Sequence, residues 1–155
     1  MNDPERSPVS PETPTSDAEE PIDLSEHPIL FFDGVCGLCD STVDWLLKRD
    51  RDGVLRFAPL QGETAGRMLS PAETASLSSV VLKDDAGNHR QSRAIVRALG
   101  RLGGRYRLYS WLLWLIPAPL REFGYGMIAK VRYRVFGKRE TCRMPSPAER
   151  GRLLP

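Results

Sequence analysis

The chain has 155 residues, of which 41% are hydrophobic and 27% are charged, and its net charge is +2. These values are typical of a soluble globular domain with or without a tail. Its longest apolar run, Trp111 to Leu120, has about half of the roughly 20 residues that a membrane span needs, and two prolines interrupt it. Three cysteines are too few for a disulfide-rich secreted scaffold, so we expect a cytoplasmic protein with no transmembrane segment.

Residues 1–27 are rich in Pro, Ser, Glu and Asp, and they include no apolar stretch of the kind found in signal peptides. Such a composition buries too little apolar surface to offset the entropy lost on ordering. We therefore expect a disordered acidic tail over 1–27, a folded domain over 28–145 and a short C-terminal tail over 146–155.

The first half of the domain has the pattern of a strand, a helix and a second strand. Ile29–Phe32 is a continuous apolar run followed by Asp-Gly, which indicates a short strand buried on both faces. From Cys39 onward, Val43 and Leu46 recur at helical spacing, and the run 54–58 predicts the next strand. Together these elements predict a right-handed βαβ unit.

The middle of the chain has the pattern of a short helical linker followed by a hairpin and a helix. Residues 61–77 fit one or two short helices, 80–83 and 89–91 fit the two strands of the hairpin, and Ser92 is the expected N-cap of a helix through Leu99. This order of elements is that of a thioredoxin-like βαβ–ββα core, so the predicted fold class is α/β.

The last third predicts a C-terminal helical extension. Residues 106–116 are apolar nearly all round, which predicts a helix packed against the body of the domain. A second amphipathic helix follows, with apolar residues at Leu120, Phe123, Met127, Val131 and Val135. From Arg97 onward there are 13 basic residues and three acidic ones. This half either attracts an anionic partner or presents an ordinary solvated basic face.

Cys36 and Cys39 form a C-x-x-C pair between the first strand and the first helix. A cysteine reacts as the thiolate, and its usual pKa is about 8.5. The orphan N–H groups and the partial positive charge at a helix N-terminus favour that anion. Cys39 follows one helical turn later, where its thiol can attack a mixed disulfide at Cys36. This placement favours redox chemistry.

Two other interpretations of the pair remain open. A structural metal site would need further ligands from Cys142, His27 or His89, and the sequence holds no second paired motif. The two cysteines could also be inert thiols in the core. Cys142 itself is a candidate resolving thiol, metal ligand or ordinary side chain, whereas His89, beside the hairpin turn, is expected to be exposed and incidental.

Asp33 lies directly after the first strand and three residues before Cys36. If this carboxylate lies near the sulfur atoms, it can relay the proton that Cys39 must lose. The competing interpretation is a turn residue, because Asp-Gly is a common turn dipeptide.

The segment ILFFDGVCGLCDSTVDWLLKRDRDGVLRFAPLQG resembles the opening of the thiol-disulfide oxidoreductase DCC family, whose Asp-Cys-Cys pattern corresponds to Asp33, Cys36 and Cys39. The similarity continues through SRAIVRALGRLGGRYRLYSWLLWLIPAPLREFGYGMIAKVRYRVFGKRETC and covers roughly 28–145. It implies a thioredoxin-like fold and disulfide exchange by the cysteine pair, without a further cofactor. The expected partners are a protein or small-molecule disulfide and a cellular thiol reductant; nucleic acid is not expected.

The sequence departs from thioredoxins proper just before the hairpin. Thioredoxins place a cis-proline there, facing the cysteines, and its backbone receives the substrate. This chain has Ser79 before Val80, so substrate docking is expected to differ. The alternative function is a redox-silent thioredoxin-like module that docks an anionic partner through its basic C-terminal half.

Overall fold

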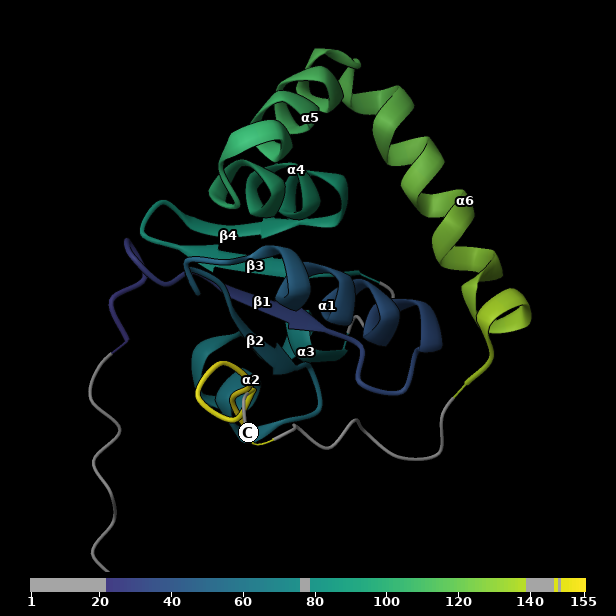
Figure 1. Cartoon of the computed structure of the whole chain (residues 1–155). Helices are drawn as coiled ribbons and strands as arrows, with labels where there is room; N and C mark the ends of the chain where they lie inside the picture. Colours follow the sequence, from purple (N-terminus) through teal and green to yellow (C-terminus); the bar gives the residue numbers. More distant parts are fainter. Residues whose placement is uncertain (1–21, 76–78, 139–146, 148) are drawn as a thin grey trace, which may run out of the picture.

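The computed structural model describes residues 22–75, 79–138, 147 and 149–155. Four strands form one sheet in the order β2-β1-β3-β4, and helices cover both of its faces (Figure 1). In chain order the elements are β1 (Ile29–Phe32), α1 (Gly37–Arg49), β2 (Arg56–Pro59), α2 (Glu63–Met68), α3 (Pro71–Ala75), β3 (Val81–Asp84), β4 (Gly87–Arg90), α4 (Gln91–Arg101), α5 (Gly104–Leu115) and α6 (Ala118–Phe136).

Strand β1 lies in the centre of the sheet and is buried on both faces. It pairs parallel with β2 and antiparallel with β3, which pairs antiparallel with β4. Leu30 and Phe32 pack with α1 and α4 on one face, and Ile29 and Phe31 pack with α2 on the other. A run that is apolar at every position suits such a strand, because side chains alternate between the faces. The predicted thioredoxin-like core with C-terminal helices is confirmed.

The packed body includes residues on both sides of the range 28–145. Ile22 and Leu24 pack on the α2 face of the sheet. Near the C-terminus, Leu153 forms a β-bridge with Phe57, and Arg152 is paired with Asp50. A few apolar residues in an otherwise polar segment are enough to bring it against the core. Residues 1–21, the greater part of the predicted tail, lie outside the described ranges.

Helix α4 begins two residues earlier than predicted, and Ser92 is not its N-cap. The N-cap is Arg90, and Ser92 lies in the first turn. The Ser92 hydroxyl accepts a hydrogen bond from Arg121 Nε at 2.6 Å and donates one to Glu122. The side chain predicted to cap the helix therefore connects α4 to the start of α6.

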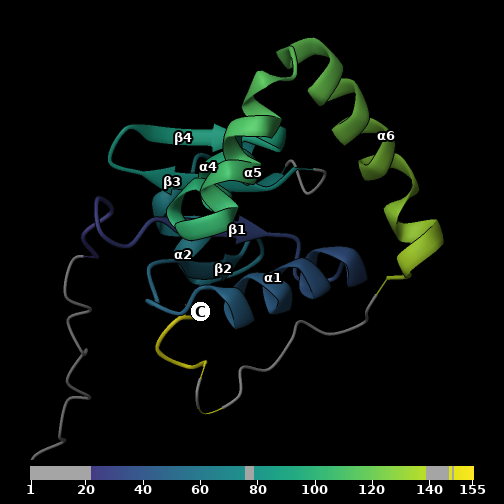
Figure 2. The same ribbon diagram turned by 45° about the horizontal axis from the view of Figure 1, so that its top comes forward.

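Helices α5 and α6 form a bent arm, in which α5 packs on α4 and α6 runs back towards α1 (Figures 1 and 2). Tyr106 is buried, and the Ser110 hydroxyl donates to the Val96 carbonyl at 2.8 Å. The helix predicted over 106–116 packs against the body on one side only, since Trp114 is 69% exposed. One side of α5 meets α4, whereas Leu108, Trp111, Leu112 and Leu115 on its other side are exposed.

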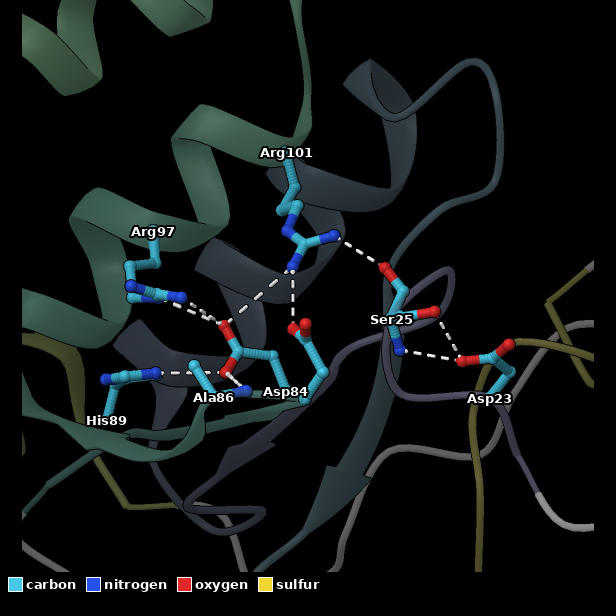
Figure 3. A network of polar contacts seen from close by, with 8 residues as sticks. Asp23, Ser25, Asp84, Ala86, His89, Arg97 and Arg101 are labelled. Carbon is cyan, nitrogen blue, oxygen red and sulfur yellow. Dashed lines mark hydrogen bonds and ion pairs between the residues drawn. The ribbon is translucent and has the colours of Figure 1, made fainter.

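The buried carboxylate of Asp84 joins the β3–β4 hairpin to α4 (Figure 3). It accepts hydrogen bonds from the Ala86 N–H at 3.0 Å and from Arg97 Nε at 3.0 Å, and it contacts His89 Nε2 at 3.0 Å. His89, expected to be exposed and incidental, is therefore part of the network. Burial alone would raise the pKa of Asp84, but the hydrogen bonds and charges of Arg97 and His89 outweigh burial and lower it.

We expect Asp84→Asn to lower the free energy of unfolding by about 2 kcal/mol, because hydrogen bonds to a charged group are lost. Since the pKa of Asp84 is lowered in the folded state, this contribution is present above the unfolded pKa of about 4 and is lost as the pH falls through the folded value. Urea titrations of both proteins at several pH values measure the difference. The neighbouring Asp85→Asn is the control, because its 59% exposed side chain pairs with Arg101 in solvent. Equal losses for the two variants contradict the prediction.

Candidate functional site

The two cysteines lie at the start of α1, where the sequence pattern placed them. Cys36 is the N-cap residue, and its sulfur accepts a hydrogen bond from the Cys39 N–H at 3.4 Å. Both side chains are free thiols, with Cys36 0% and Cys39 6% exposed. A sulfur at this position faces the positive end of the helix.

Asp33 is buried beside the pair and is held by four hydrogen bonds. Its Oδ1 accepts from Gln61 Nε2 at 2.9 Å and from the Val35 N–H at 3.2 Å. Its Oδ2 accepts from Arg132 Nη2 at 3.1 Å and from the Tyr133 hydroxyl. The bond to Val35 shows that Asp33 shapes the turn into α1, and the remaining bonds make it the centre of a polar cluster.

Arg132 of α6 is the residue that joins this carboxylate to the cysteine pair. Its side chain is buried, and one guanidinium donates to Asp33 Oδ2 at 3.1 Å through Nη2 and to Cys39 Sγ at 3.4 Å through Nη1. The planar guanidinium suits such a two-sided contact better than an ammonium. Tyr133, the next residue on α6, contacts both Arg132 and Asp33.

The sequence pattern did not place Arg132, Tyr133 or Gln61 at the cysteine site. Arg132 and Asp33 are 99 residues apart in the sequence. The spacing of the apolar residues in α6 also predicts that the side of the helix carrying its leucine and valine residues faces the body. The one sequence feature that could have indicated Arg132 is its position between two apolar or aromatic neighbours. A basic residue in such a position is equally typical of a solvent-exposed helix face.

The environment of the cysteine pair changes the acidity of two groups. Burial is the main reason that the pKa of Cys39 rises to about 12, and the hydrogen bond and charge of Cys36 raise it further, whereas the charge of Arg132 lowers it. Burial and the hydrogen bond to Asp33 raise the pKa of Tyr133 to about 12. Cys39 and Tyr133 are therefore both protonated at neutral pH.

The C-terminal end of α6 covers Cys36. Lys138 forms a β-bridge with Cys36, and the Gly37 N–H donates to the Gly137 carbonyl at 3.4 Å. The approach is so close that a Cβ at Gly37 would lie 2.5 Å from the carbonyl oxygen of Phe136. A substrate can reach the Cys36 sulfur only when this end of the helix moves.

A small apolar cavity of about 80 Å³ lies between Cys39 and the inner side of α6. Among its lining residues, Val80 donates its N–H to the Tyr125 hydroxyl at 2.9 Å. Val80 follows Ser79, which stands where thioredoxins have their cis-proline. The Tyr125 hydroxyl of α6 therefore takes up a backbone N–H just before β3, next to Ser79.

The structure describes no metal site at the pair. Among the described residues, no group of three or more His, Cys, Asp and Glu side chains could hold a metal ion. His27 and His89 lie elsewhere, in contact with the Val54 carbonyl and with Asp84 respectively. Cys142, a candidate third ligand or resolving thiol, lies outside the described residues.

We expect Arg132→Lys to slow alkylation of Cys39 several-fold at a given pH, because one ammonium cannot contact both Asp33 and Cys39. Since the charge of Arg132 lowers the pKa of Cys39, the alkylation profile should move to higher pH. Mass spectrometry of iodoacetamide-treated protein over a pH series measures the effect. The exposed Arg150 provides the control Arg150→Lys. Superimposable profiles for the two variants contradict a role of Arg132 at the sulfur.

Known proteins resemble this chain over most of its length. Residues 30–138 match the family of DCC1-like thiol-disulfide oxidoreductases. The chain is 40% identical over 129 residues to "Uncharacterized protein YuxK" of Bacillus subtilis, covering 82% of this chain and 93% of the relative. It is 31% identical over 121 residues to "DCC family protein At1g52590, chloroplastic" of Arabidopsis thaliana, covering 77% of this chain and 70% of the relative. No solved structure matches. The chain belongs to the DCC1-like thiol-disulfide oxidoreductase family.

Proposed function

We propose that the protein exchanges disulfides with a substrate through Cys36 and Cys39. The observation that carries this proposal is the contact of the Cys36 sulfur with the Cys39 N–H at the N-terminus of α1, with the Arg132 guanidinium against Cys39. A helix N-terminus and a cation are the two features that make a cysteine reactive.

In the first step the Cys36 thiolate attacks one sulfur of a substrate disulfide. A bond forms between Cys36 Sγ and that sulfur, the substrate S–S bond breaks, and the other substrate sulfur leaves as a thiolate. The attack requires the end of α6, at Gly137 and Lys138, to leave Cys36.

In the second step Cys39 loses its proton and attacks Cys36 Sγ. The mixed disulfide breaks, the second substrate thiolate leaves, and the pair has transferred two electrons and become a disulfide. Burial is the main reason that the pKa of Cys39 is high in the free protein, and the hydrogen bond and charge of Cys36 raise it further. A mixed disulfide at Cys36 removes the two contributions of Cys36, so the pKa of Cys39 is lower once substrate has bound.

Asp33 supports this step in two ways. It holds the Arg132 guanidinium in place, and it is the carboxylate that we propose as acceptor of the Cys39 proton, with Arg132 bridging the two groups. The pair needs no other cofactor, and a cellular thiol reductant in the cytoplasm would return it to the dithiol. Protein disulfides are the substrates that the family suggests.

We expect Cys36→Ser to abolish reduction of a test disulfide, because the attacking sulfur is gone. Cys39→Ser should instead accumulate a mixed disulfide at Cys36, since the resolving thiol is missing. Insulin reduction and thiol-trapping mass spectrometry in glutathione buffers measure both results. Unchanged turnover of Cys36→Ser would contradict the mechanism. A pair that never forms an intramolecular disulfide would favour the redox-silent binding module.

We expect Gly37→Ala to speed alkylation of Cys36 several-fold, because the added Cβ forces the Phe136 carbonyl away from the start of α1. Gly66→Ala in α2 is the matched control, since its Cβ would meet nothing within 4 Å. The rates of Cys36 alkylation by iodoacetamide are measured under conditions in which circular dichroism shows that both variants are folded. A rate for Gly37→Ala equal to that of the control would mean that the end of α6 does not limit access.

A further inference from the structure

Helices α5 and α6 expose most of the large apolar side chains on the described surface. All of the exposed large apolar residues except Trp45 lie between Leu108 and Phe136. Phe123 is 70% exposed and Trp114 is 69% exposed. A concentration of this kind on one arm of a molecule marks an interaction surface.

The exposed apolar residues of each helix form a stripe opposite the side that packs on the body. On α5 the stripe consists of Leu108, Trp111, Leu112 and Leu115, at the spacing of one helix face. Its other side carries Tyr106 and Ser110, which are buried or bonded to α4.

On α6 the stripe consists of Leu120, Phe123, Met127, Val131 and Val135. The opposite side carries Tyr125, Ala129 and Arg132, which line the cavity beside Cys39. The stripe of α6 is therefore free to meet a partner while the helix keeps its contacts with the cysteine site.

The arm is strongly basic. Residues 104–138 contain a single acid, Glu122, whose carboxylate accepts a hydrogen bond from the Ser92 hydroxyl. The seven bases in the same range are Arg105, Arg107, Arg121, Lys130, Arg132, Arg134 and Lys138. Lys130 and Arg134 are exposed, and they lie on the same edge of the α6 stripe as Phe123 and Met127. A partner therefore needs apolar groups and negative charge together.

A basic hollow of about 560 Å³ lies where α5 turns into α6. Arg93 lines it together with the exposed Trp114 and Ile116. Arg97 and Arg121 also line it, and their guanidinium groups are bonded to Asp84 and Ser92 respectively. Guanidinium groups are suited to phosphate oxygens, and here they lie directly beside apolar side chains. The hollow therefore combines positive charge with apolar surface, as the whole arm does.

We propose that the arm formed by α5 and α6 docks on an anionic phospholipid membrane surface. The apolar stripes enter the boundary between headgroups and acyl chains, and the basic residues contact lipid phosphates. None of the described helices is long and apolar enough to cross a membrane, so the contact is peripheral. The proposal does not depend on the redox chemistry of the cysteine pair.

Charge argues against the other occupants of this surface. Two arms of the same protein, placed face to face, would bring Lys130 and Arg134 of each copy together with no acid to pair with them. The acidic segment 1–21 of this chain has the right charge but contains no Leu, Ile, Phe, Trp or Tyr to cover the stripes. An anionic lipid surface supplies both the negative charge and the apolar groups that the arm needs in a partner.

Sedimentation with vesicles tests the proposal. The full chain is mixed with vesicles of phosphatidylglycerol and phosphatidylcholine, or of phosphatidylcholine alone, at low and high salt. We expect binding to the anionic vesicles that weakens with salt, and a loss of about tenfold or more for Arg134→Glu. Phe123→Ser should weaken binding similarly, because an exposed apolar group is lost. Arg150→Glu, an equal charge change away from the arm, should bind like wild type.

Tryptophan fluorescence locates the contact. In the variant that keeps only Trp114, emission should shift to the blue and be quenched by brominated lipids. The variant that keeps only Trp45 of α1, which packs against Tyr106, should change little. Circular dichroism melts establish that the variants are folded.

Three results would overturn the proposal. One is that wild-type protein does not sediment with anionic vesicles. Another is that it binds phosphatidylcholine equally well and Arg134→Glu has no effect, which would exclude the anionic headgroup. The third is a dimer in solution that Phe123→Ser converts to a monomer, which would assign the stripes to a second copy of the chain.

Discussion

The buried contact of Arg132 with Asp33 and Cys39 is the interaction on which the arrangement of this molecule depends. It joins the last helix to the loop between the first strand and the first helix, and it places a fixed positive charge beside a thiol. A buried charge without a partner is costly, whereas a hydrogen-bonded pair is tolerated. Removing Arg132 would therefore leave the buried Asp33 carboxylate without its ion-pair partner and weaken the hold of α6 on the cysteine site.

The core could be predicted from the sequence because its strands and helices follow the ordinary rule that apolar residues face inward. β1 is apolar at every position and is buried on both faces, and Val43 and Leu46 of α1 are in the core. The same rule fails for α6. Its apolar stripe faces outward, and the side that carries Arg132 and Tyr125 faces the body. Periodicity shows which residues share a face, but the direction of that face depends on partners 99 residues away.

The sequence therefore predicted only part of the candidate site. Asp33, Cys36 and Cys39 are close in sequence, and a strand followed by a helix is enough to bring them together. Arg132, Tyr133 and Gln61 come from other elements, and their contacts with Asp33 depend on tertiary packing. The complete burial of Cys36 also depends on a distant segment, the turn after α6. A local pattern contains no information on either.

Because α6 carries polar contacts inward and apolar groups outward, the two faces of one helix serve the two proposed activities. Little of its apolar surface is buried against the body, so polar contacts such as those of Arg132, Tyr133 and Tyr125 hold it over the cysteines. Any event that shifts the helix acts on both faces at once. If docking changes the fraction of molecules in which α6 leaves Cys36, linkage requires that opening at Cys36 change the affinity for the docked surface by the same factor.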